Sequence, residues 1–302
     1  MSQAPLGIDH PLVTVRDHPA TLENYRRMGF SPSPVSYHPW GTVTSLLMFA
    51  DNFIEIIGVD DATKFGPKNP ENGALGDFCF GRFLGDFLDR EEGISLVALH
   101  SGDARADAAA VVARGLQNRG FIDFRRKMTL PDGTPDEAVV SLALLIDAAL
   151  PEASHFICHQ HRPELIWVPE WQQHDNGARG ITSITYLAES PQALAPRLAG
   201  LYGEAALQHG ADLLRVDSGC GEFRVVDAAG AARLFPGTAV PPFDTSRPHG
   251  IAVSVAIRSL DEQAARLRDA GIEFARAAAG EAGDSLLVGA GDSGNIILEF
   301  TE

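Results

Sequence analysis

The run GIDHPLVTVRD (residues 7–17) alternates in the manner of a β-strand, and it opens the unit from which we predict the fold. His10 and Leu12 fall on one face of this strand, and Val13 and Val15 fall on the other. Such a strand can pack one face in the core and present functional side chains on the other.

A helix and three further strands are expected to follow. Residues 18–29 carry Leu22, Tyr25 and Met28 at helical spacing, and Gly29 stands where a helix commonly ends in a left-handed residue. Turn residues then separate three strand-like runs, which cover residues 33–38, 42–49 and 52–59. The first unit of the chain is therefore predicted to be βαβββ.

The same unit recurs near the carboxyl end of the chain. Residues 250–258 have a strand pattern and lead into a helix pattern over residues 261–271, which again ends in glycine. The closing strands also correspond, with NFIE (52–55) matching NIILE (295–299) after a shift of one residue. A repeat of this kind determines an architecture more firmly than local propensity does.

Two weaker copies lie between, and all four copies open with Gly-Ile. The polar, turn-rich residues 171–177 mark a domain boundary. We therefore predict an α+β fold in which four βαβββ modules form two domains, each with curled mixed sheets around a cleft. The N-terminal domain is residues 1–175, with modules 7–59 and 93–168, and the C-terminal domain is residues 178–302, with modules 180–235 and 249–302.

The composition excludes several classes of protein. The net charge is −16, from 24 Lys and Arg against 40 Asp and Glu, which disfavours nucleic-acid binding. No apolar run reaches the roughly 18 to 20 residues of a membrane helix, and no secretory signal is visible, so we expect a cytoplasmic protein. Three scattered cysteines make neither a disulfide framework nor a zinc site. The sequence leaves the subunit number open, a homodimer included.

Paired βαβββ units of this kind resemble the vicinal oxygen chelate (VOC) superfamily, which includes glyoxalase I and extradiol dioxygenases. More narrowly, the chain is similar to bacterial glyoxalase-like domain proteins in the motifs IDH (8–10), VRD (15–17), HPWG (38–41) and FIE (53–55). The resemblance implies a cleft with a divalent metal held by the first and fourth strands of its modules. By position, His10 and Glu55 are then metal ligands in the first module, for Zn, Fe, Mn or Ni.

The second module departs from that pattern. Its first strand offers only Ile94 or Leu96 where a ligand is expected. Its last strand aligns Cys158 with Glu55, and a shift of one residue selects His159 instead. Strand alternation puts His159 and His161 on one face, with Cys158 and Gln160 on the other. We favour His159 and His161 as the remaining metal ligands.

Other residues have a functional and a structural interpretation. Glu55 lies in an apolar strand, where a carboxylate requires a partner or a metal, and it is a candidate catalytic residue. Glu164 is a general base or a salt-bridge partner. His38 and Trp40 flank a turn, and they bind substrate at the lip of the cleft or serve as packing.

Two functions are consistent with these residues. The first is a metal-dependent lyase, isomerase or dioxygenase that acts on a small molecule with vicinal oxygens, with Glu55 or Glu164 moving a proton. The alternative is a metal-free protein of the same fold that binds and sequesters a small molecule. Binding that survives chelation and the His10→Ala substitution would distinguish the second from the first.

Overall fold

The computed structural model describes residues 4–66, 74–243, 246–280 and 283–302. The first module comprises β1 (Ile8–Thr14), α1 (His18–Arg27), β2 (Ser36–Tyr37), β3 (Thr42–Met48) and β4 (Phe53–Val59). The second comprises β7 (Gly93–His100), α3 (Ala104–Ala113), β8 (Phe121–Thr129), β9 (Pro135–Leu145) and β10 (His155–Gln160). Between them lie β5 (Ala74–Leu75), β6 (Phe78–Cys79) and α2 (Phe80–Leu88).

The second half repeats this order. The third module comprises β11 (Gly180–Leu187), α4 (Ala195–Tyr202), β12 (Leu207–His209), β13 (Leu213–Asp217), β14 (Glu222–Val226) and a following helix α5 (Ala228–Leu234). The fourth comprises β15 (His249–Ala256), α6 (Leu260–Asp269), β16 (Phe274–Gly280), β17 (Gly283–Val288) and β18 (Ile297–Thr301). The predicted α+β fold of four βαβββ modules is therefore confirmed. The predicted division into domains at residues 175–178 stays a prediction.

One predicted strand is much shorter than expected. Of residues 33–38, only Ser36–Tyr37 forms a strand, although Ser33 and His38 also donate backbone hydrogen bonds to β3. Pro34 precedes this segment and has no N–H to donate to a ladder, which shortens the strand. The polypeptide before β2 forms part of the entrance to a pocket instead.

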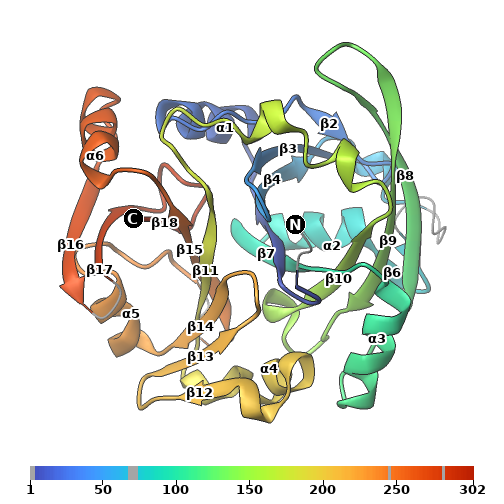
Figure 1. The fold of residues 1–302 in the computed structure, drawn as a ribbon. Helices are drawn as coiled ribbons and strands as arrows, with labels where there is room; N and C mark the ends of the chain where they lie inside the picture. Colours follow the sequence, from blue (N-terminus) through green and yellow to red (C-terminus); the bar gives the residue numbers. More distant parts are fainter. Residues whose placement is uncertain (1–3, 67–73, 244–245, 281–282) are drawn as a thin grey trace.

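The strands form two curled halves of one sheet (Figure 1). In the N-terminal half, β1 pairs with β4 in parallel and with β7 in antiparallel orientation, and β10, β9 and β8 continue from β7. The C-terminal half repeats this arrangement around β11 and β15. The halves join where Gly250 of β15 faces Ile94 of β7. A Cβ at Gly250 would lie 2.8 Å from the Ile94 Cβ, so this close approach requires glycine.

Helices of different modules meet at the two sides of this junction. The Tyr25 hydroxyl near the end of α1 donates to the Ser293 carbonyl at 3.0 Å, and the Gln263 amide of α6 donates to the Met28 carbonyl at 3.1 Å. On the other side, Arg114 after α3 donates to the Gly200 carbonyl in α4 at 2.8 Å. The first module therefore packs against the fourth, and the second against the third.

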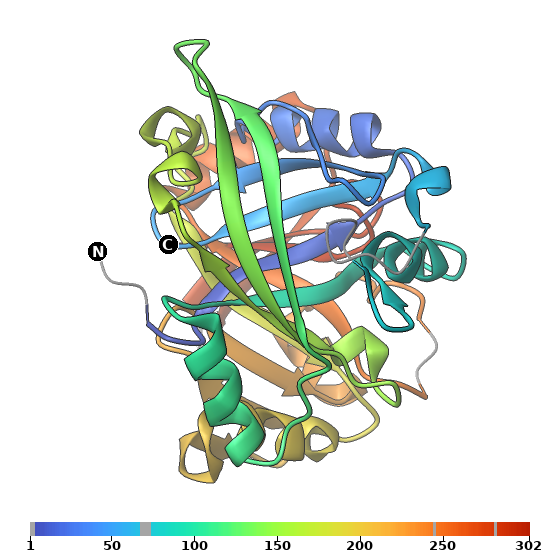
Figure 2. The same ribbon diagram turned by 90° about the vertical axis from the view of Figure 1, so that its right-hand side faces the viewer.

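The interiors of the two halves hold separate apolar clusters. In the N-terminal half Leu12, Ile57, Leu96 and Phe156 pack together, and in the C-terminal half Phe235, Ile251, Leu287 and Ile297 do so. A third and larger cluster spans both halves. Figure 2 shows that the β8–β9 hairpin runs along the N-terminal half and extends beyond it. No helix within the described ranges is long and apolar enough to cross a membrane.

Candidate active site in the N-terminal half

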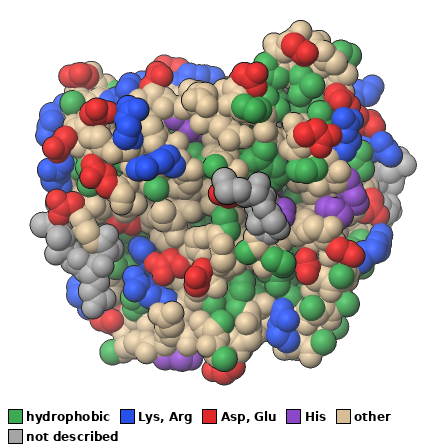
Figure 3. Space-filling view, in the orientation of Figure 1, with side chains coloured by type: hydrophobic (Ala, Val, Ile, Leu, Met, Phe, Trp, Pro, Cys, Tyr) green, Lys and Arg blue, Asp and Glu red, His purple; other side chains and the backbone are tan. Residues whose placement is uncertain are grey.

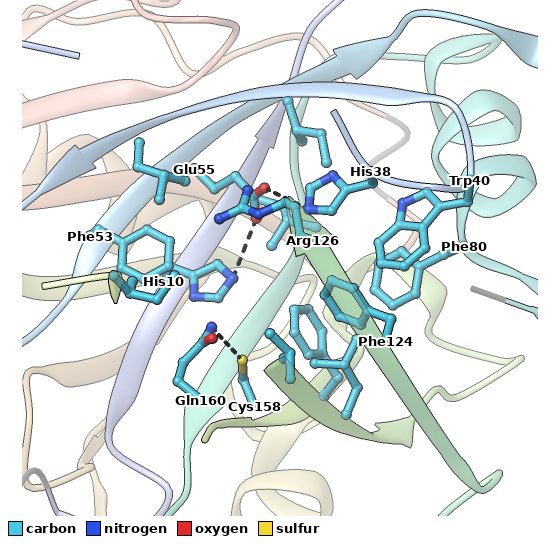
Figure 4. A pocket seen from close by; sticks show the side chains of 17 residues that line it. His10, His38, Trp40, Phe53, Glu55, Phe80, Phe124, Arg126, Cys158 and Gln160 are labelled. Atoms are coloured by element: carbon cyan, nitrogen blue, oxygen red, sulfur yellow. Dashed lines mark hydrogen bonds and ion pairs between the residues drawn. The ribbon is translucent and has the colours of Figure 1, made fainter. Parts of the chain in front are cut away.

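The interior of the N-terminal half contains a cavity of about 50 Å³ (Figure 4). Strands from both modules line it, together with α2 and the turn between β2 and β3. Most of its wall is apolar and aromatic, and its polar lining residues are His10, His38, Glu55, Arg126, Cys158 and Gln160. A few polar groups that converge inside an apolar wall are typical of a small-molecule site.

Strand alternation explains which side chains reach this cavity. In β4, Phe53, Glu55 and Ile57 point inward, and in β1 His10 and Leu12 do so. Glu55 faces Leu12 in the parallel β1–β4 ladder. The alternation predicted for residues 7–17 therefore placed His10 on the face of its strand that lines the cavity.

Glu55 is the acceptor around which the polar groups gather. The residue is only 6% exposed, and its side chain accepts a hydrogen bond of 2.7 Å from the Thr44 hydroxyl. His10 Nε2 lies 3.4 Å from one carboxylate oxygen, and His38 Nε2 lies 3.9 Å from the other. Burial alone would raise the pKa of Glu55, but His10, His38 and Thr44 outweigh it and lower this pKa to about 2.

His10 is held between two carboxylates. Its Nδ1 lies 2.5 Å from Asp9 Oδ1, and its ring stacks on Phe53 at a centroid distance of 4.1 Å. Asp9 in turn lies 3.3 Å from His100. Burial disfavours the charged imidazole, but the hydrogen bonds to Asp9 and Glu55 prevail and raise the pKa of His10 to about 9.

His38 lies on the opposite side of Glu55. Its Nδ1 forms a hydrogen bond of 2.9 Å with the Thr42 hydroxyl, and its ring stacks on Trp40 at 4.7 Å. Burial lowers the pKa of His38 to about 4, and the attraction of Glu55 only partly offsets this. His38 is therefore a neutral imidazole at neutral pH, whereas His10 is charged.

Three polar lining residues are not among the predicted site residues: Arg126 was not considered, and Cys158 and Gln160 were passed over in favour of His159 and His161. Arg126 of β8 lies across the centre of the pocket near Glu55 and His38 (Figure 4). Cys158 and Gln160 of β10 line the opposite wall, and the Gln160 amide donates to Cys158 Sγ at 3.3 Å. Alternation in FIDFRRKMT (121–129) sets Phe124 and Arg126 on one face with Ile122, and this signal was available.

The structure does not bring His159 and His161 into this pocket. Cys158 and Gln160 line the cavity, so the alternation of β10 directs His159 to the other face. The ring centroids of the two imidazoles lie 4.0 Å apart, and His161 Nε2 forms a hydrogen bond of 2.8 Å with the Ser141 hydroxyl. Glu164 also lies outside the cavity lining, exposed and paired with Arg162 at 3.0 Å.

The donors in the pocket fit a divalent metal in their chemistry. His10 and His38 both turn Nε2 toward an ionised carboxylate while Asp9 and Thr42 hold their Nδ1 atoms, which is how outer partners orient metal-binding imidazoles. The Gln160 amide oxygen is buried here without a hydrogen-bond partner among the described residues. The ligand atoms of His10, His38 and Glu55 do not all lie within 4.8 Å of one another. Binding of one metal by all three residues therefore requires their side chains to move closer together.

A second group of potential ligands does meet that distance. Glu91, Glu152 and His249 bring ligand atoms within 4.8 Å of one another at the junction of β7 and β15. Arg90 and Arg247 both pair with Glu152, at 3.1 and 3.4 Å. These two cations already compensate the acids, which indicates an ion-pair network between the halves.

Comparison with known proteins agrees with this fold. The sequence profile of a glyoxalase-like domain matches residues 8–202. A hypothetical protein from Staphylococcus aureus superimposes with a TM-score of 0.61 at 12% identity over 98% of each chain. A mutant of 4-hydroxymandelate synthase from Streptomyces coelicolor gives 0.58 at 13% identity over 98% of this chain and 92% of that one.

A third solved structure extends beyond the present chain. It is a xylose isomerase-like TIM barrel/4-hydroxyphenylpyruvate dioxygenase fusion protein, with a TM-score of 0.55 at 13% identity. The match covers 99% of this chain and 49% of that one. No curated protein matches the chain. At these identities the likeness concerns the fold.

Proposed function

The chain belongs to the glyoxalase-like domain family, and from that premise we propose that its N-terminal half is a metal-dependent active site for a small molecule with vicinal oxygens. The reaction would be that of a dioxygenase, a lyase or an isomerase. Glu55 carries this proposal, because the Nε2 atoms of His10 and His38 face its two oxygens inside an apolar wall. Two imidazoles and one carboxylate are a recurrent set for divalent metals.

Each residue of the set has a part in binding or proton movement. His10, His38 and Glu55 would hold the metal, which when bound acts as a Lewis acid on substrate oxygens. His10 carries a proton on Nε2 without metal, so metal binding must release it. Glu55 stays ionised above a pH of about 2, which suits an anionic metal ligand and makes it a weak base while that pKa holds.

The wall of the pocket supports the same proposal. Trp40, Phe53, Phe80, Phe124 and Phe156 surround the polar groups and exclude water, which strengthens electrostatic interactions inside. The Trp40 indole N–H is buried without a hydrogen-bond partner among the described residues. A substrate oxygen within reach of this N–H would satisfy it.

The test measures metal rather than turnover. Protein produced with ample Zn, Fe, Mn and Ni is analysed for bound metal, next to His10→Ala and to His159→Ala, a matched histidine outside the pocket. We expect metal in the unmodified protein and in His159→Ala, and loss of at least tenfold in affinity in His10→Ala. Metal-free unmodified protein would sink the proposal.

The alternative function is metal-free binding in the same cavity. The separation of the three ligand groups and the nearby Arg126 guanidinium favour it. Under this alternative a small molecule binds equally well after chelation. Binding to His10→Ala protein at unchanged affinity would select it.

A further inference from the structure

We propose that the molecule bound in this pocket is an organic anion, a carboxylate or a phosphate with an apolar body, and that Arg126 binds its anionic group. This inference rests on the proposed function, in that it places the substrate in the N-terminal half. It adds the charge and shape of that substrate, which the metal proposal leaves open.

The first observation concerns the state of Arg126. No hydrogen bond or ion pair reaches its guanidinium from the residues that the structure describes, although the side chain is half-buried. Burial lowers the pKa of Arg126, and the attraction of Glu55 only partly compensates. A guanidinium withdrawn from water without a partner is costly, and a bidentate oxyanion would remove that cost.

The second observation is the surface pocket that joins the inner cavity. This outer pocket has a volume of about 530 Å³ between the segment around β2 and the strand β8, and it shares His38, Leu46 and Arg126 with the inner cavity. Arg126 therefore stands at the boundary of the two spaces. A ligand that enters through the outer pocket passes beside its guanidinium.

The third observation is the charge of that entrance. The described lining of the outer pocket contains Arg125, Arg126 and Lys127 but neither Asp nor Glu, in a chain with a net charge of −16. Figure 3 shows acidic side chains scattered over both halves of the face it displays. A local absence of acids on an acidic protein favours the entry of an anion.

The fourth observation is the apolar wall of the outer pocket. Val35 and Tyr37 are 47% and 54% exposed and lie here beside Met128 and Trp171. Exposed apolar side chains next to a cavity are typical of a ligand-binding surface. They fit an apolar body attached to the anionic group.

The experiment compares three probes of similar size by calorimetric titration: benzoate, phenyl phosphate and neutral benzamide. At least one anion is expected to bind the unmodified protein about tenfold or more tightly than benzamide, because charge-assisted hydrogen bonds require the oxyanion. The preferred anion distinguishes a carboxylate from a phosphate substrate. Arg126→Gln is expected to remove the preference, and Arg126→Lys to restore part of it.

Arg258→Gln is the matched control, since it removes the same charge from an exposed residue of the C-terminal half that lines neither pocket. It should change affinity by no more than about twofold at physiological salt. Equal binding of benzamide and both anions would overturn the inference, as would a preference that persists in Arg126→Gln. No binding of either anion at about 10 mM, above the usual range for small substrates, would also overturn it.

All titrations are run with added metal and after chelation. An anion preference in protein that binds no metal would sink the proposed function and leave this inference standing. Bound metal without an anion preference would overturn this inference and leave the proposed function standing.

Discussion

Glu55 in β4 and Glu299 in β18 occupy matching registers in the two halves of the sheet. Glu55 faces Leu12 of β1, and Glu299 faces Ser254 of β15. Both side chains are buried, at 6% and 3% exposure. His10 lies two residues before Leu12 in β1, and the equivalent residue two before Ser254 in β15 is Ala252.

The partners of the two carboxylates differ. Glu299 accepts a hydrogen bond of 2.5 Å from the Ser254 hydroxyl and lies 3.6 Å from Arg224, which also pairs with Glu222. Glu55 faces two imidazoles and a cavity instead. A glutamate at equivalent positions of β4 and β18 therefore faces a cavity where histidines compensate it, and is enclosed where a permanent cation does.

The largest expected effect is on the free energy of unfolding, and it distinguishes Arg224 from Arg126. Arg224→Met leaves the buried Glu299 without its cation, so it should lower the free energy of unfolding by about 3 kcal/mol. Arg126→Met removes a cation that has no such partner and should change it by less than about 1 kcal/mol. Urea unfolding of both variants measures this difference, and equal losses would break the comparison.

The next effect is on metal affinity, and it distinguishes Glu55 from Glu299. Glu55→Gln should reduce metal affinity by about 100-fold, because it removes the anionic ligand, whereas Glu299→Gln should leave it unchanged. Metal titration of both purified variants measures the effect. A similar loss in Glu299→Gln would place the metal elsewhere.

A smaller effect concerns pH in chelator-treated protein. His10 should keep its proton up to a pH of about 9, and His38 should stay neutral down to about 4. The raised pKa of His10 stabilises the fold fully below about 6.5, and this contribution is lost as the pH rises through about 9. The lowered pKa of His38 destabilises the fold as the pH falls from about 6.5 toward 4, because the unfolded chain takes up that proton.

Nuclear magnetic resonance titration of the histidine side chains tests these values. Glu55→Gln should lower the pKa of His10, since it removes one of the two carboxylates that raise it. Glu299→Gln is the matched control and should leave it unchanged. Two histidines that both titrate near 6.5 would contradict the electrostatic description of the N-terminal half.

The smallest effect compares two hydroxyl donors. Ser254→Ala and Thr44→Val each remove one hydrogen bond to a buried carboxylate, and each should cost about 1 to 2 kcal/mol of unfolding free energy. Thr44→Val should in addition raise the pKa of Glu55, because Thr44 helps to lower it. Thermal unfolding measures the first expectation, and an unchanged melting temperature in Thr44→Val would refute it.

The sequence was sufficient for the fold because the repeated Gly-Ile strands and glycine-ended helices leave few alternatives. It also proposed His10, Glu55, His38 and Trp40 as site residues, and all four line the cavity. These four residues lie in or beside strands of the first module. Their local pattern therefore determines which face they occupy.

The residues of the second module were harder to predict. The side of β10 that faces inward depends on its pairing with β9, and a shift of one residue exchanges His159 for Cys158 or Gln160. Arg126 lies within the charged run Arg125–Lys127, which has the composition of a solvated edge. The structure places its guanidinium near Glu55 (Figure 4).

The contact between the first and fourth modules has a consequence for biosynthesis. Tyr25 and Met28 bind partners at Ser293 and Gln263, which leave the ribosome only after nearly the whole chain has been made. At roughly 5 to 20 residues per second, α1 waits many seconds for these partners. Its apolar face is then a natural place for a chaperone to bind, although every residue that lines the inner cavity has already been synthesised.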